Sequence, residues 1–180
     1  MSGNWDESAR VPHRQLDADA ILHTLLAHEV EFLVIGGLAV GAHGYPRATK
    51  DVDVVPAPER QNLRRLHAAL TELRAEPLEI GDLRAEELPV PFGHEGLDEG
   101  GNWTLRTSAG RVDVMQWVPG IDGGYGQLRP NAIEADVPGV GRVLFAGYDD
   151  LVTMKRTANR PEDELDLRRL ARVRDDDTLP

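Results

Sequence analysis

The sequence predicts an α/β (α+β) fold, in which helices pack on a mixed β-sheet and a short pair of helices closes the chain. Short apolar runs such as 32–35 are typical of buried strands. Leucines at spacings of three and four between 63 and 73 indicate an amphipathic helix. Two further helical segments, 147–157 and 161–173, follow the last expected strand. The chain has 180 residues, of which 41% are apolar, so it is long enough for one domain with a substantial core.

The N-terminal part should contain an arm, a helix and a strand. Residues 1–14 have charges and a proline but no apolar period, so we expect a flexible arm. Asp17 is a suitable N-cap for a helix that extends to position 28. The apolar segment 32–35 is expected to be a buried strand that stops at the glycine pair 36–37, and a short helix should follow over 38–43.

The middle of the chain contains the clearest strand and the least regular segment. Residues 45–50 are expected to form a loop, and 51–55 alternate with period two, which indicates a strand with both aspartates on one face. After the helix around 63–73, residues 76–102 are acidic and show no strong period, so we expect a surface loop or short insertion there.

The C-terminal part begins with a predicted hairpin of strands at 103–107 and 111–118. A glycine-rich loop at 120–126 separates it from two strands near 132–136 and 142–145. We therefore divide the chain into four parts: the arm 1–14, a core at 15–146, a helical segment at 147–174 packed on that core, and a frayed tail at 175–180.

Composition restricts the class of protein. The formal net charge of −11 makes a broad nucleic-acid-binding surface unexpected, because such a surface needs many cations against phosphate. No run has the ~18 apolar residues that a membrane helix requires, and the N-terminus lacks the apolar stretch of a signal peptide. Cysteine is absent, which excludes thiolate metal sites and cysteine nucleophiles. We expect a cytoplasmic protein without membrane partners.

Asp51 and Asp53 are the first candidates for chemistry. Two carboxylates one residue apart on a strand point to the same face, and hard oxygen ligands of this kind suit magnesium. The neighbouring valines place the strand inside the fold, where unpaired charge is expensive. The alternative is an exposed edge strand whose aspartates are solvated or paired with Arg47 or Lys50.

The glycine pair, Gly36 and Gly37, adds a candidate anion site. A strand followed by glycines and a helix exposes free backbone N–H groups, and glycine lets a phosphate approach closely. A plain strand-to-helix turn is the alternative. Leu38 breaks the dinucleotide-binding pattern Gly-x-Gly-x-x-Gly, and no P-loop motif is present.

Asp113 is the candidate third carboxylate, because it lies between two valines as Asp53 does. If the two strands are neighbours, Asp113 faces Asp51 and Asp53, and three carboxylates can bind two divalent ions. A single aspartate at a hairpin remains the alternative reading.

These motifs resemble the signature of the DNA polymerase β-like nucleotidyltransferase superfamily. The signature is an apolar strand, Gly-Gly or Gly-Ser, ten to thirteen residues, and Asp-h-Asp/Glu-h, where h is apolar; here Phe32–Gly37 is separated from Asp51–Val54 by thirteen residues. The loop 47–51 and the helical end from Phe145 to Asp163 are similar to small bacterial members, namely minimal and antibiotic nucleotidyltransferases and abortive-infection type toxins.

The resemblance implies roles for individual residues. Asp51, Asp53 and Asp113 would be both the catalytic residues and the ligands of two Mg²⁺ ions, with Mn²⁺ as a substitute. Nucleotide binding would involve seven residues: Gly36, Gly37, Arg47, Thr49, Lys50, Lys155 and Arg160. Lys155 is the first choice among the cations, against the alternative of a solvated lysine at a helix end. Asp163 and Asp166 are expected to be structural, paired with Arg160 or Arg169.

The implied function is Mg²⁺-dependent transfer of a nucleoside monophosphate from a nucleoside triphosphate, ATP included, to a hydroxyl acceptor, with release of pyrophosphate. The acceptor would be a small molecule, a tRNA or a partner protein. The alternative is a non-catalytic nucleotide-binding module, or a toxin–antitoxin partner, that keeps the same fold.

Overall fold

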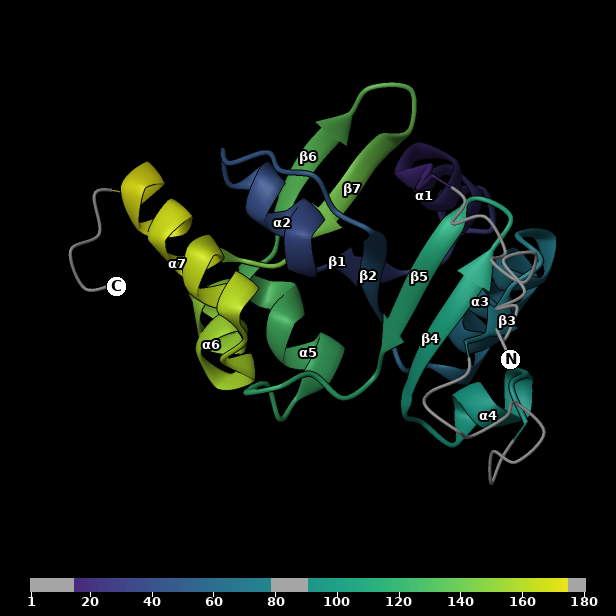
Figure 1. Ribbon diagram of the computed structural model, residues 1–180. Helices are drawn as coiled ribbons and strands as arrows, with labels where there is room; N and C mark the ends of the chain where they lie inside the picture. Colours follow the sequence, from purple (N-terminus) through teal and green to yellow (C-terminus); the bar gives the residue numbers. More distant parts are fainter. Residues whose placement is uncertain (1–14, 79–90, 175–180) are drawn as a thin grey trace, which may run out of the picture.

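The computed structural model describes residues 15–78 and 91–174, and these fold around one seven-stranded sheet (Figure 1). The strand order is β3-β4-β5-β2-β1-β7-β6. The predicted arm 1–14 and the tail 175–180 lie outside the described residues, as does part of the acidic segment 76–102. The predicted α/β class, a mixed sheet with packed helices, is confirmed.

The strands occupy seven short stretches of the chain. Their bounds are β1 Phe32–Val34, β2 Asp51–Pro56, β3 Glu76–Pro77, β4 Asn102–Thr107, β5 Gly110–Met115, β6 Ile133–Val137 and β7 Gly141–Phe145. The α-helices are α1 Ala18–Ala27, α2 Gly36–Ala42, α3 Arg60–Glu72, α4 His94–Asp98, α5 Gly124–Leu128, α6 Tyr148–Ala158 and α7 Pro161–Arg174. A 3₁₀ turn, Arg129–Asn131, follows α5.

Two parallel pairings at the centre of the sheet bring distant segments together. β2 pairs in parallel with β5, although α3, β3, α4 and β4 separate them along the chain. β1 pairs in parallel with β7 and antiparallel with β2. β4 and β5 form an antiparallel hairpin, as predicted, and the two further predicted strands, β6 and β7, also pair antiparallel. Strand β2 therefore lies between two neighbours and cannot be an edge strand.

Helices cover both faces of this sheet. α1 and α3 contact each other and β2 on one side, while α5 contacts β1 and β2 and α2 contacts α6 on the other (Figure 1). Val52 and Val54 of β2 are fully buried, and Asp51 and Asp53, which alternate with them along the strand, point to the opposite face. Burial of this apolar strand is what fixes the direction of the two carboxylates.

Several element boundaries agree with the sequence, and others differ. The acidic segment 76–102, expected as a surface loop or short insertion, contains strand β3 and helix α4 within its described residues. Asp17 caps α1 by accepting a hydrogen bond from the Ala20 N–H at 3.0 Å, as expected. Helix α2 begins at Gly36 rather than at residue 38, so both glycines belong to its first turn. The expected loop at 120–126 contains the start of α5, whose Leu128 is fully buried; its glycines concealed this helix in the sequence.

The chain ends in two packed helices, α6 and α7, separated by Asn159 in a left-handed conformation and Arg160. None of the helices in the described ranges is long and apolar enough to cross a membrane.

Candidate functional site

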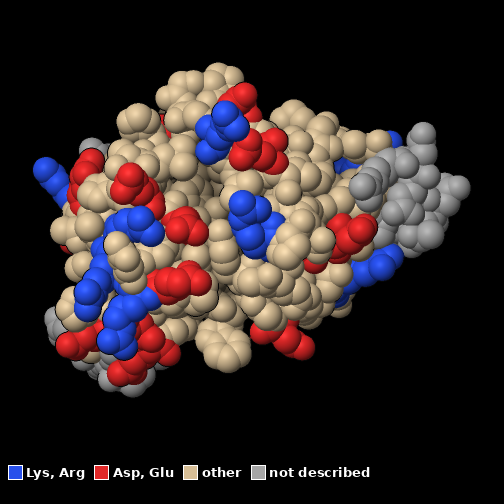
Figure 2. Space-filling model, turned by 180° about the vertical axis from the view of Figure 1, so that it is seen from behind, with Lys and Arg blue, Asp and Glu red and all other residues tan. Residues whose placement is uncertain are grey.

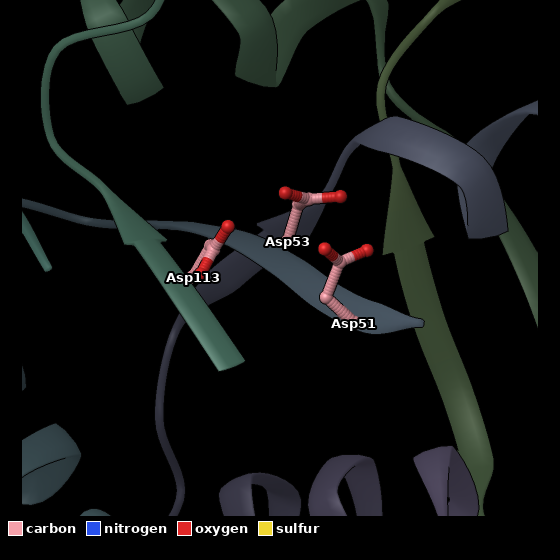
Figure 3. Close-up of side chains that lie close together, drawn as sticks. All are labelled: Asp51, Asp53 and Asp113. Carbon is pink, nitrogen blue, oxygen red and sulfur yellow. The ribbon is translucent and has the colours of Figure 1, made fainter. Parts of the chain in front are cut away.

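Three aspartates meet on one face of the central strands. In the parallel ladder, Asp53 lies directly opposite Asp113, and Asp51 is two residues earlier on β2. Carboxylate oxygens from the three residues all lie within 4.8 Å of one another, and the side chains project from β2 and β5 to the same side of the sheet (Figure 3). The predicted convergence of Asp113 with the other two is therefore confirmed.

Burial and mutual repulsion disfavour the state in which all three aspartates of this cluster are ionised. Burial, together with the charges of Asp51 and Asp113, raises the pKa of Asp53 to about 7, while Lys155 and Arg111 oppose the rise. Asp113 is only 9% exposed. Three carboxylate oxygens at this spacing are hard ligands without nitrogen or sulfur, a donor set that fits a divalent cation such as Mg²⁺ or Mn²⁺.

The first turn of α2 lies directly against Asp53. Gly36 has φ +64°, and a Cβ at this position would overlap the Asp53 carboxylate. Glycine is required here for both reasons, since other residues rarely adopt this conformation and none would leave room for the carboxylate. The backbone of Ile35 also donates a hydrogen bond to the Asp53 carbonyl at 3.0 Å. The glycine pair therefore fits helix α2 to the acidic cluster.

The loop before β2 contributes Thr49 and Arg47. The Thr49 hydroxyl lies 3.2 Å from Asp51 Oδ1 and from the Asp51 carbonyl, so it can donate to either oxygen. A Cβ on Gly37 would stand 2.9 Å from Thr49 Oγ1 and 3.0 Å from Arg47 Nη2. Gly37 thus provides space for these two side chains. Lys50 is exposed, and no contact joins it to the aspartates.

Lys155 lies in a buried ion cluster rather than in solvent. It is 5% exposed, and its Nζ is 2.8 Å from Asp163 Oδ1 and 2.9 Å from Asp166 Oδ2. The alternative of a solvated lysine at a helix end is wrong, because the packing of α6 on α7 encloses this side chain. This ion cluster lies near the three aspartates, since the charge of Lys155 acts against the rise in the pKa of Asp53.

Three arginines complete this ion cluster. Arg160 Nε donates to Asp163 at 2.8 Å, Arg47 Nη2 donates to Asp166 at 2.9 Å, and Arg169 Nη1 is 3.5 Å from Asp166. The predicted structural role of Asp163 and Asp166 is therefore consistent with their contacts, since they are fully or almost fully buried. Burial acts to raise the pKa of Asp163, but the hydrogen bonds from Arg160 and Lys155 together with the charge of Lys155 lower it below its ordinary value.

Arg111 is the site residue that the sequence did not single out. Its Nε donates to Asp113 Oδ1 at 3.0 Å and its Nη2 to Asp113 Oδ2 at 2.6 Å. Nε also lies 3.8 Å from Asp51 Oδ2. These contacts raise the pKa of Arg111 above its ordinary value, with the hydrogen bond to Asp113 as the main cause. Its position two residues before Asp113 on one strand, hence on the same face, was the available signal.

His43 and Trp117 both lie outside the cluster of three aspartates. His43 lies at the end of α2, with Nε2 2.9 Å from the carbonyl oxygen of Ala146 and the ring edge-on to Tyr148. Trp117 is exposed at the rim beyond β5, where Asn102 accepts from its N–H and donates to its carbonyl, each at 2.9 Å.

The fold is shared with solved nucleotidyltransferases. A lincosamide antibiotic adenylyltransferase, LnuA, in its lincomycin-bound crystal structure, aligns with a TM-score of 0.59 at 12% identity, covering 89% of this chain and 99% of that one. The antibiotic-resistance factor ANT(2'')-Ia aligns in two structures. Its complex with adenylyl-2''-tobramycin gives a TM-score of 0.53 at 15% identity, covering 86% and 87% of the two chains. Its solution structure gives 0.51 at 15% identity, covering 86% and 82%.

No protein-family model matches the sequence, and no curated protein matches it by sequence comparison. At these identities the similarity to solved structures concerns the fold. That fold is the nucleotidyltransferase fold, as the resemblance to the DNA polymerase β-like superfamily predicted.

Proposed function

We propose that the chain transfers a nucleoside monophosphate from a nucleoside triphosphate to a hydroxyl acceptor in a Mg²⁺-dependent reaction. The observation that carries this proposal is the register that sets Asp53 opposite Asp113, with Asp51 on the same face, inside a nucleotidyltransferase fold. In the reaction, the acceptor oxygen forms a bond to the α-phosphorus. The bond from that phosphorus to the bridging oxygen breaks, and pyrophosphate leaves with the electron pair.

We propose separate roles for the aspartates and the glycines in this reaction. Asp51, Asp53 and Asp113 would hold two Mg²⁺ ions, which when bound supply positive charge and orient the phosphates. A carboxylate of the same group takes the proton that the attacking hydroxyl loses. Gly36 and Gly37 would let the phosphates approach the backbone of α2.

The negative charge of a bound triphosphate requires basic side chains near the site. A triphosphate and three aspartates bring about seven negative charges, and two Mg²⁺ ions offset about four of them. We propose that Arg47, Thr49, Lys50, Lys155 and Arg160 serve nucleotide binding. The ion cluster contributes a surplus of positive charge, because four basic side chains pair with three carboxylates: Lys155, Arg47, Arg160 and Arg169 with Asp163, Asp166 and Glu162. Within it, Lys155 acts through its charge and by positioning α7, since both of its partners are internal.

For the acceptor, we propose a small molecule with a hydroxyl group. The structures of similar fold include a lincomycin-bound adenylyltransferase and a complex with adenylylated tobramycin. On the face shown in Figure 2, basic and acidic side chains of the described residues are interspersed and form no continuous basic surface. A long RNA needs such a surface for its phosphates, so a tRNA is the less suitable acceptor.

One observation favours the non-catalytic alternative, a nucleotide-binding module or toxin–antitoxin partner. Arg111 occupies both oxygens of Asp113, the residue that a second metal ion would require. A protein that binds nucleotide through Asp51 and Asp53 alone would retain affinity without transfer.

The test combines binding with transfer of label. Mg²⁺ and nucleotide together should raise the melting temperature, and Asp53→Asn should abolish that rise. The matched control is Asp136→Asn, an exposed aspartate on the outer strand β6, which should behave as the unaltered protein. Label from α-³²P nucleotide should then reach a pool of hydroxylated small molecules. A melting shift without transfer to small molecules, tRNA or protein would support the alternative, and no shift at all would reject both.

A further inference from the structure

Arg111 is the charged group of the site that the proposed reaction leaves without a role. It lies opposite Asp51 in the β2–β5 ladder, so its side chain and the three aspartates share one face of the sheet. Because β5 is a central strand, this direction is fixed by the burial of Val112 and Val114 on the other face.

The guanidinium of Arg111 engages Asp113 completely. Two N–H groups meet the two oxygens of the carboxylate, at 3.0 and 2.6 Å, in the bidentate geometry that gives arginine its strongest pairs. The same Nε is 3.8 Å from Asp51, so the positive charge lies between two of the three carboxylates. This is where a divalent ion shared by Asp51 and Asp113 would have to bind.

The guanidinium and a divalent ion cannot both bind Asp113 tightly at this position. A cation at Asp113 would lie within a few ångströms of the guanidinium, where like charges repel strongly in a partly buried site. By contrast, no hydrogen bond joins Arg111 to Asp53, and its contact with Asp51 is long, so the oxygens of these two residues are less obstructed. The Arg111 side chain is 43% exposed, which leaves it free to move toward solvent.

We infer that Arg111 is a built-in cation that competes with a divalent ion for Asp113 and so sets the order in which the site fills. Asp51 and Asp53 would hold the first ion, and Asp113 would become available as a ligand only when Arg111 withdraws. This inference rests on the metal site of the proposed function but not on any acceptor or on transfer itself.

The experiment counts Mn²⁺ ions bound to the full chain by electron paramagnetic resonance and calorimetry, without nucleotide. The unaltered protein should bind one ion tightly and a second weakly. Arg111→Gln should tighten the second ion about tenfold or more, because its competitor is gone. The control Arg142→Gln removes an arginine that is 73% exposed and paired with Glu134 at 3.1 Å on the β6–β7 hairpin, and it should change neither ion.

A double-mutant cycle locates the competition. In an Asp113→Asn background, Arg111→Gln should tighten Mn²⁺ binding much less, because the contested carboxylate is absent and only the longer 3.8 Å contact of Arg111 with Asp51 remains. Equal tightening with and without Asp113 would overturn the inference, as would unchanged affinity in Arg111→Gln. If Arg111→Gln does not fold, Arg111→Met provides the same comparison, because methionine also removes the charge while keeping a long unbranched side chain.

The same data separate this inference from the proposed function. If Asp53→Asn abolishes Mn²⁺ binding while Arg111→Gln leaves it unchanged, only the role of Arg111 is rejected. If the unaltered protein binds no Mn²⁺, or if Asp53→Asn leaves binding intact, the metal site and both proposals are rejected.

Discussion

Replacement of Gly36 by alanine tests whether α2 is fitted to the acidic cluster. The added Cβ would overlap the Asp53 carboxylate, and the residue would have to keep φ +64°. Either Asp53 must turn away from Asp51 and Asp113, or the first turn of α2 must move. Both outcomes disturb the proposed metal site through a residue that has no functional group of its own.

The expected loss of stability has two parts. A left-handed conformation costs a non-glycine residue about 1–2 kcal/mol, and overpacking a filled site costs about 1–3 kcal/mol. The free energy of unfolding should therefore fall by about 2–5 kcal/mol, which for a chain of this size corresponds to a drop in melting temperature of about 4–20 °C. Affinity for Mn²⁺ should fall at the same time, because Asp53 is displaced.

Gly41→Ala is the matched control within the same helix. The nearest atom to its Cβ would be Pro46 Cα at 3.6 Å, an ordinary contact, and alanine is favoured over glycine inside a helix by about 1 kcal/mol. Denaturant unfolding and Mn²⁺ titration of both variants provide the comparison. If Gly36→Ala matches Gly41→Ala in stability and in metal affinity, the fit between α2 and Asp53 is not what requires glycine.

Three other predictions use the same assays. A bulky residue at Gly37 should meet Thr49 and Arg47, so nucleotide affinity should fall more than stability; equal losses would contradict a role in binding. Lys155→Met should leave Asp163 and Asp166 with only their arginine partners and destabilise the fold by about 3 kcal/mol, measured by urea unfolding, with a matching loss of nucleotide affinity. Because the pKa of Asp53 is raised to about 7, the metal-free protein should lose stability from this group as the pH rises from about 4 to 7, while Mn²⁺ affinity rises about tenfold per unit over the upper part of that range. A flat Mn²⁺ titration between pH 6 and 8 would contradict the raised pKa.

Local patterns were sufficient for the three aspartates and for every described strand except β3, which lies in the segment expected as a loop. The alternation in β2 assigned Asp51 and Asp53 to one face, and the valines beside Asp113 marked a second buried strand. The pairing of those two strands was only a conditional expectation, because parallel partners sixty positions apart leave no short-range signal in the sequence. The structure shows the pairing directly, with Asp53 opposite Asp113.

The surroundings of Lys155 and Arg111 could not be predicted in the same way. Lys155 is buried because α6 packs on α7, and helix packing is set by the complete fold rather than by the residues near position 155. Arg111 was overlooked although it shares a face with Asp113, since an arginine on a strand is more often solvated than bonded to a buried carboxylate. Helix α5 was missed because its glycines resemble a loop.

The parallel pairing of β2 with β5 also determines when the site comes into existence during folding. Helix α3 and the β4–β5 hairpin can form from neighbouring residues, whereas the β2–β5 ladder must close a large loop first and is therefore slow. Until it closes, Asp113 is far from its partners, and a divalent ion finds at most two carboxylates. Ligands that need all three will bind only chains that have completed the sheet, so they should slow unfolding without accelerating the early steps of folding.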